Sequence, residues 1–152
     1  MSIVIRIEKT TSENTDFHTL IAALDHDLWE RYPAEGAEYW ENNILEFNPN
    51  VLVVYLNDVA VACACFKKYE KSTMELKRMF VAPKARGLGL AQQLLFELET
   101  WAVELGYETA VLETLHLQKE AIGLYQKMGY EITANYPPYV GLPDSVCMQK
   151  QL

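Results

Sequence analysis

The spacing of apolar residues changes several times along this 152-residue chain, and each change predicts an element of secondary structure. Residues 3–8 alternate between apolar and polar side chains, which indicates a strand with one buried face. Residues 12–30 have apolar positions three and four apart, which predicts a helix capped by Ser12 or Asp16. Its apolar face is expected to consist of Phe17, Leu20, Ile21, Leu24 and Leu28. A second helix is predicted over residues 36–47.

The middle of the chain predicts three strands, over residues 51–56, 59–66 and 73–81. The first two are continuously apolar, which indicates a sheet that is covered on both faces. Asn57-Asp58 between them is typical of a two-residue hairpin turn, because both residue types tolerate a positive φ angle. A second turn is expected over residues 67–72.

The rest of the chain alternates between helical and extended patterns. The predicted helices cover residues 88–105 and 118–128, and the predicted strands cover residues 109–113, 130–133 and 145–151. Gly106 and Gly129 end the two helices. The order of elements, β-α-α-β-β-β-α-β-α-β-β, predicts an α/β fold with a mixed, mostly antiparallel sheet of about seven strands and helices on both faces. The length predicts a single domain over residues 1–152.

Composition narrows the class of protein. Half of the residues are apolar, and the net charge of −8 argues against a general nucleic-acid-binding surface. The absence of a run of about 18 apolar residues, and of a signal peptide, predicts no membrane partner. Three cysteines suit a reducing compartment and have no metal-ligand spacing. We therefore expect buried free thiols, no metal and a cytoplasmic location.

A glycine-containing turn joins the strand over 73–81 to the helix over 88–105. Free N–H groups and the dipole of a helix start form an anion site. The turn lacks the Gly-Lys-Ser/Thr ending of a P-loop, and Gln92 stands where a dinucleotide fingerprint has its third glycine. Four basic residues surround the turn, which indicates a small anionic ligand, with a solvated charged rim as the alternative. They are Lys77, Arg78, Lys84 and Arg86.

Two motifs resemble those of the GNAT (Gcn5-related N-acetyltransferase) family. Arg86-x-x-Gly89-x-Ala91 matches the family's Arg/Gln-x-x-Gly-x-Gly/Ala signature at a strand-to-helix junction. Residues 121–130, Ala-Ile-Gly-Leu-Tyr-Gln-Lys-Met-Gly-Tyr, resemble its A-x-x-L-Y-x-x-x-G-F/Y helix. The predicted element order is that of the GNAT fold, so the resemblance covers essentially the whole chain. It implies acetyl-CoA, or a related acyl-CoA, as the co-substrate, and no metal.

The resemblance also implies where acetyl-CoA lies. Its pyrophosphate is expected on the N–H groups of the glycine turn, and its pantetheine arm along the preceding strand. Gln118 stands where many family members have Asn, and it keeps the amide. The residues implied are Met79, Phe80, Val81, Arg86, Gly87, Leu88, Gly89, Leu90, Ala91, Gln92 and Gln118.

Three residues are candidates for proton transfer. Tyr125 matches the family's tyrosine, and a phenol is protonated at neutral pH and can donate to a leaving thiolate. The alternative for Tyr125 is ordinary core packing. Glu75 and Glu113 are candidate bases for the amine, through water, and the alternative for each is an ion pair. A backbone N–H near Met79 is expected to stabilise the oxyanion.

Four aromatic residues are expected to line the acceptor pocket, with packing in loops as the alternative: Trp29, Tyr32, Tyr136 and Tyr139. Aromatic rings and carboxylates suit a small cationic amine. The resemblance implies direct transfer of acetyl to a primary amine of a small molecule or peptide, through a tetrahedral intermediate. A non-catalytic acyl-CoA sensor with the same fold is the alternative. The acceptor is not named by the sequence, and a homodimer is left open.

Overall fold

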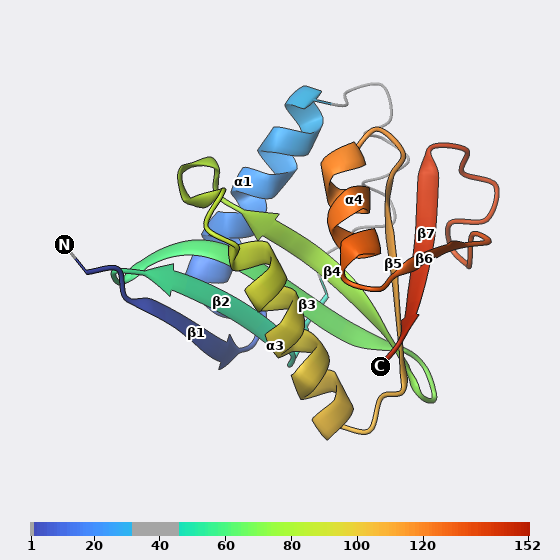
Figure 1. The fold of residues 1–152 in the computed structure, drawn as a ribbon, viewed down its shortest axis with the longest axis horizontal. Helices are drawn as coiled ribbons and strands as arrows, with labels where there is room; N and C mark the ends of the chain where they lie inside the picture. Colours follow the sequence, from blue (N-terminus) through green and yellow to red (C-terminus); the bar gives the residue numbers. More distant parts are fainter. Residues whose placement is uncertain (1, 32–45) are drawn as a thin grey trace.

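The computed structural model describes residues 2–31 and 46–152 (Figure 1). The predicted helix over 36–47 falls almost entirely outside them. The strands are β1 (Ile5–Thr10), β2 (Val51–Leu56), β3 (Val59–Glu70), β4 (Thr73–Val81), β5 (Thr109–Leu115), β6 (Glu131–Thr133) and β7 (Ser145–Gln151). The helices are α1 (Thr15–Arg31), α3 (Leu90–Glu104) and α4 (Lys119–Lys127), with a short 3-10 helix at Pro83–Ala85.

The seven described strands form one sheet, in the order β1-β2-β3-β4-β5-β7-β6. Neighbouring strands are antiparallel except β4 and β5, which run parallel. Helix α3 connects these two strands, as a parallel pair requires. The prediction of a mixed, mostly antiparallel sheet of about seven strands is confirmed.

Helices cover both faces of the sheet, and strand β2 shows why. Successive side chains of a strand point to opposite faces. Val51 and Val53 therefore pack in the cluster that contains the apolar face of α1. Leu52 and Val54 pack in the other cluster, with α3 and α4. Figure 1 shows α3 and α4 on one side of the sheet and α1 on the other. The continuous apolar strands are thus buried on both faces, as predicted.

The feature that creates space in this sheet is the separation of β4 from β5. The two strands pair only where Thr73–Glu75 faces Thr109–Val111, although both continue well beyond. Strand β4 also carries a bulge, because the register of its pairing with β3 shifts around Arg78. Arg78 adopts a φ angle of 59°, in the left-handed region. A bulge bends its strand and strengthens its twist, which suits divergence of β4 from β5.

Two details of the elements differ from the sequence prediction. Helix α1 is capped by Asn14, whose Oδ1 accepts a hydrogen bond from the Phe17 N–H at 3.0 Å. The predictions of Ser12 and Asp16 as caps are wrong, and the Ser12 hydroxyl instead accepts from the Asn48 N–H at 2.7 Å. Strand β3 continues to Glu70, through most of the predicted turn, because its end pairs with the start of β4.

Candidate active site

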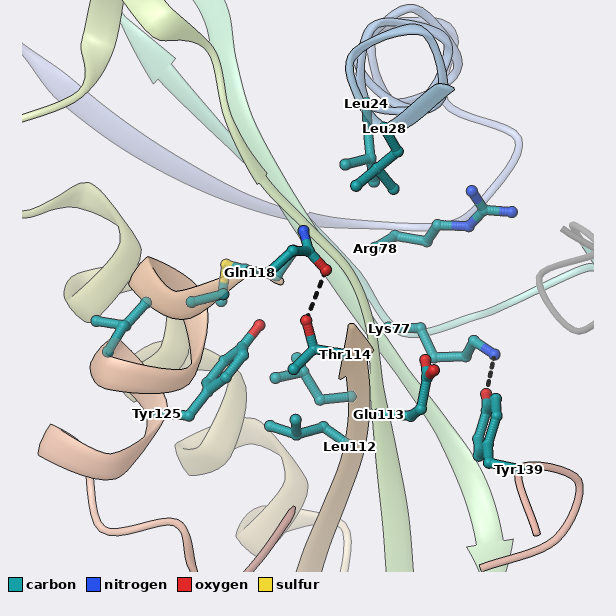
Figure 2. A pocket seen from close by; sticks show the side chains of 14 residues that line it. Leu24, Leu28, Lys77, Arg78, Leu112, Glu113, Thr114, Gln118, Tyr125 and Tyr139 are labelled. Atoms are coloured by element: carbon teal, nitrogen blue, oxygen red, sulfur yellow. Dashed lines mark hydrogen bonds between the residues drawn. The ribbon is translucent and has the colours of Figure 1, made fainter. Parts of the chain in front are cut away.

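A cleft opens where β4 and β5 separate (Figure 2). It contains about 730 Å³ of atom-free space, part of it open to solvent. Residues 76–79 of β4 and 112–114 of β5 form its two long walls. Leu24 and Leu28 of α1 lie on one side of the sheet, and residues of α4 lie on the other. The cleft therefore passes between the two strands and connects the two faces of the sheet.

The glycine turn lies between the 3-10 helix and α3. Gly87 and Gly89 have φ angles of 82° and 75°, a region that side chains with a Cβ disfavour. The first bond of the helical ladder is donated by Gln93 to the Gly89 carbonyl, at 3.2 Å. The N–H groups of residues 90–92 therefore make no hydrogen bond within the helix and point out of its N-terminal end. The Arg86 Nε donates to the Val81 carbonyl at 3.0 Å, which fixes the turn to the end of β4.

The four basic residues expected around the turn do not form one patch. The Lys77 Nζ lies 3.8 Å from the Glu75 Oε1, deep beside β4. The Arg78 Nη1 donates to the Asp25 Oδ1 of α1 at 2.8 Å. The prediction that both serve the turn is wrong, because closeness in sequence along a bulged strand does not keep side chains together in space. Of the four, only Lys84 and Arg86 belong to the turn region.

Tyr125 of α4 points its hydroxyl into the cleft (Figure 2). The side chain is buried, and its ring packs edge-on against Tyr130 with 5.8 Å between the ring centroids. Burial raises the pKa of the Tyr125 phenol above its ordinary value, so the group remains protonated at neutral pH. Within the described part of the chain, its hydroxyl makes no hydrogen bond. The phenol is therefore available as a proton donor to a group in the cleft.

Gln118 stands at the start of α4 and is held by β5. Its Oε1 accepts from the Thr114 hydroxyl at 2.7 Å and from the Leu115 N–H at 3.3 Å. A backbone N–H only donates, so the oxygen end of the amide is fixed on β5. The amide NH₂ group is turned away from that strand (Figure 2). Gln118 therefore presents donors, not an acceptor, at the cleft wall.

The two candidate bases have different surroundings. Glu113 lines the cleft, and its Oε2 accepts from the Ser145 hydroxyl of β7 at 2.6 Å. Burial raises the pKa of Glu113 to about 7, against opposing effects of Ser145 and Lys77. Glu75 is 3% exposed and does not line the cleft. Its Oε2 accepts from the Tyr136 hydroxyl at 2.7 Å, and its Oε1 faces Lys77.

The four aromatic residues expected at the acceptor pocket do not share one position. Tyr139 lines the cleft, and its hydroxyl accepts from the Lys77 Nζ at 3.3 Å. Tyr136 lies against the Tyr139 ring, with its hydroxyl on Glu75. Trp29 is 53% exposed on α1 and does not line the cleft. Tyr32 lies outside the described residues.

Comparison with known proteins identifies the family. Residues 16–130 match the family model for acetyltransferases of the GNAT family. The IAA acetyltransferase of Azospirillum brasilense is 34% identical over 140 residues, which cover 88% of each chain. This chain belongs to the GNAT family. It is accordingly an acetyltransferase, and GNAT enzymes act on amine acceptors.

Solved structures agree with the GNAT assignment. An acyl-CoA N-acyltransferase structure from Klebsiella pneumoniae is 31% identical, has a TM-score of 0.81 and covers 98% of both chains. A Bacillus subtilis acetyltransferase, solved in complex with CoA, has a TM-score of 0.70 at 19% identity. It covers 98% of this chain and 99% of that one. At 19% identity, this second likeness shows the GNAT fold alone.

The GNAT site contains residues to which the sequence analysis gave no role. Thr114 lies four positions before Gln118, and this spacing across a strand-to-helix turn is the only sign of their hydrogen bond. Ser145 reaches Glu113 because β5 and β7 are neighbours, which local sequence does not reveal. The described residues include no group of three or more potential metal ligands. The three cysteines are buried free thiols, as predicted.

Membrane attachment by a spanning helix has no support in the described ranges. None of their helices is long and apolar enough to cross a bilayer.

Proposed function

We propose that this GNAT enzyme transfers an acetyl group from acetyl-CoA directly to a primary amine of a small molecule or peptide. The observation that carries the proposal is the cleft between β4 and β5, with Tyr125 and Glu113 on its walls. Direct transfer requires a proton donor for the leaving thiolate and a proton acceptor for the attacking amine. Two such groups, held by different elements around one cleft, suit direct transfer without a covalent enzyme intermediate.

The geometry fits acetyl-CoA in three places. Beyond Glu75 and Val111, the facing edges of β4 and β5 do not pair with each other. These edges suit an extended pantetheine arm, with Met79, Phe80 and Val81 on the β4 side. The amide NH₂ of Gln118 supplies donors for a pantetheine carbonyl. The N–H groups between Gly87 and Gln92 supply an anion site for the pyrophosphate. The CoA bound to the Bacillus subtilis neighbour supports the same type of co-substrate here.

The proposed chemistry balances without a metal. The amine nitrogen attacks the thioester carbon, and the carbonyl electrons move onto oxygen, which a backbone N–H near Met79 at the bulge stabilises. The tetrahedral intermediate then loses its carbon–sulfur bond. The CoA thiolate takes the Tyr125 proton, and Glu113 takes the proton of the amine, directly or through water. Both side chains return to their starting states by exchange with solvent.

Glu113 is favoured over Glu75 as the base. A base must reach the acceptor amine, and Glu113 lines the cleft while Glu75 does not. A pKa of about 7 also gives Glu113 a useful proton affinity, because an efficient base titrates near the working pH. Glu75 already accepts from Tyr136 and faces Lys77 with its other oxygen. These contacts favour a structural role for Glu75 rather than a role as the base.

The proposed acceptor end of the cleft is the part between α1 and the loop that contains Tyr136 and Tyr139. We propose that Tyr139 contacts the acceptor and that Tyr136 supports it. A role for Trp29 or Tyr32 in acceptor binding stays a prediction. So do the single domain over residues 1–152, the cytoplasmic location and a homodimer.

The test is release of coenzyme A thiol from acetyl-CoA across a panel of polyamines, amino acids, aminoglycosides and peptides. We expect thiol release that depends on one class of amine, together with a mass increase of one acetyl group on that amine. Tight binding of CoA with no release on any amine would instead favour the acyl-CoA sensor.

A further inference from the structure

Lys77 is a buried cation beside the cleft that the proposed transfer leaves without a task. Its side chain is only 12% exposed. It lies on β4 immediately before the bulge, and Figure 2 shows it next to Glu113 with its ammonium group turned to Tyr139. Burying an ammonium group is costly unless charges and hydrogen bonds compensate. A lysine in this position therefore needs a reason.

Lys77 connects β4 to the loop at the acceptor end. Its Nζ lies 3.8 Å from the Glu75 Oε1 and donates to the Tyr139 hydroxyl at 3.3 Å. The other oxygen of Glu75 accepts from the Tyr136 hydroxyl at 2.7 Å. The Tyr136 and Tyr139 rings pack edge-on, with 5.4 Å between centroids. The four side chains form one continuous network that fixes residues 136–139 against β4.

Lys77 also acts on Glu113 of β5. Its positive charge lowers the pKa of that carboxyl, against the effects of burial and of the Glu75 charge. The other groups that face Lys77 are Glu75 and Arg78 of β4, and Cys65 and Lys67 of β3. Glu113 additionally faces Ser145 and Cys147 of β7. Among these groups, Lys77 is the cation shared by the two carboxylates.

We propose that Lys77 is a positioning residue that assigns different tasks to the two carboxylates. Its ammonium group holds Glu75 as the anchor of the 136–139 loop and leaves Glu113 as the anionic proton acceptor in the cleft. This inference rests on the proposed transfer, in which Glu113 is the base. Without the cation, the two carboxylates would repel each other, and Glu113 would hold a proton at neutral pH.

The experiment measures the titration of Glu113 in the full chain without substrates, by NMR of ¹³C-labelled glutamate carboxyl groups. Glu113→Gln assigns the resonance. We expect Lys77→Met to raise the Glu113 midpoint by about one pH unit or more. Lys77→Gln keeps a donor for Tyr139 but removes the charge, so it should give the same shift even if the methionine variant folds poorly. Lys77→Arg retains the charge and should stay near the wild-type midpoint.

Activity and a matched control complete the test. The acid limb of the kcat profile should move up with the NMR midpoint in both neutral variants. Lys67→Met removes a neighbouring charge on β3 and should move neither. An unshifted Glu113 midpoint in folded Lys77→Gln overturns the inference, whatever the loss of activity. A full rate in Glu113→Gln overturns instead the proposed base, and the NMR titration separates these two failures.

Discussion

The proposed donor side and the proposed acceptor side of the cleft are built in different ways. On the donor side, the glycine turn is one continuous stretch, residues 86–92, and Gln118 and Tyr125 lie within two turns of one short helix. On the acceptor side, contacts join residues far apart in the chain. The Tyr136–Glu75 and Lys77–Tyr139 hydrogen bonds span 61 and 62 positions. Local motifs therefore predict the donor, whereas the contacts proposed for the acceptor side join residues far apart in the chain, which no motif records.

The largest expected effect distinguishes the two carboxylates. Glu113→Gln should lower kcat by about 10²–10⁴-fold, because the attacking amine loses its proton acceptor. It should also remove the acid limb of the kcat profile, which in the wild type rises as pH increases through about 7 and Glu113 ionises. The measurement is kcat against pH at saturating acetyl-CoA and amine.

Glu75→Gln is the matched comparison for that result. It should lower kcat by about tenfold, through a less ordered 136–139 loop, and it should keep the acid limb. A profile without the acid limb in Glu75→Gln, but with it in Glu113→Gln, would exchange the roles of the two residues.

A loss of about 100-fold in kcat is expected for Tyr125→Phe on the donor side, because the thiolate leaves without its proton donor. The ring packing against Tyr130 is retained, so the Kd for CoA should change less than twofold. Steady-state kinetics measures the loss in kcat, and calorimetric titration measures the Kd for CoA. An unchanged kcat removes Tyr125 as the acid.

Substitution of Gly89 tests the turn. Gly89→Ala should weaken CoA binding by about tenfold, because a Cβ at a φ angle of 75° costs about 1–2 kcal/mol and displaces the turn. In the described part of the chain, no atom beyond the two flanking residues lies within 4 Å of that Cβ, so the expected effect is backbone strain and not a clash. Gly106→Ala is the control, since Gly106 also has a positive φ angle but lies at the far end of α3. It should lower the melting temperature and leave the Kd for CoA unchanged.

The smallest expected effect concerns the rim of the acceptor side. Trp29 is exposed and absent from the cleft walls. Trp29→Ala should therefore change the free energy of unfolding by less than about 0.5 kcal/mol. Its effect on the KM for the amine reports on whether the rim touches the acceptor. An increase of more than about fivefold, with an unchanged Kd for CoA, would extend the acceptor site along α1.

Sequence reasoning recovered the fold because its evidence was local. Periodicity located the strands and helices, and the turn signatures located most of their ends. The helix motif singled out Tyr125 for the same reason, since a helix fixes spacing within one segment, and Tyr125 lines the cleft; its role as the acid stays a prediction. It failed for Lys77 and Arg78, which a bulge sends to different partners. It also left Glu75 and Glu113 equivalent, because the difference between them comes from Tyr136 and Ser145, which are distant in sequence.

The separation of β4 and β5 gives this sheet an interior edge. Exposed edges normally lie at the outside of a sheet, where they invite pairing with other chains. Here two such edges face each other inside the molecule, with α1 on one side of the sheet and α4 on the other. Because α1 and α4 lie on the two faces of the sheet at this point, these edges suit an extended, amide-bearing ligand better than a β-strand with side chains on both faces. The same backbone groups that would be an aggregation hazard at the rim are thus reserved for a ligand of limited width.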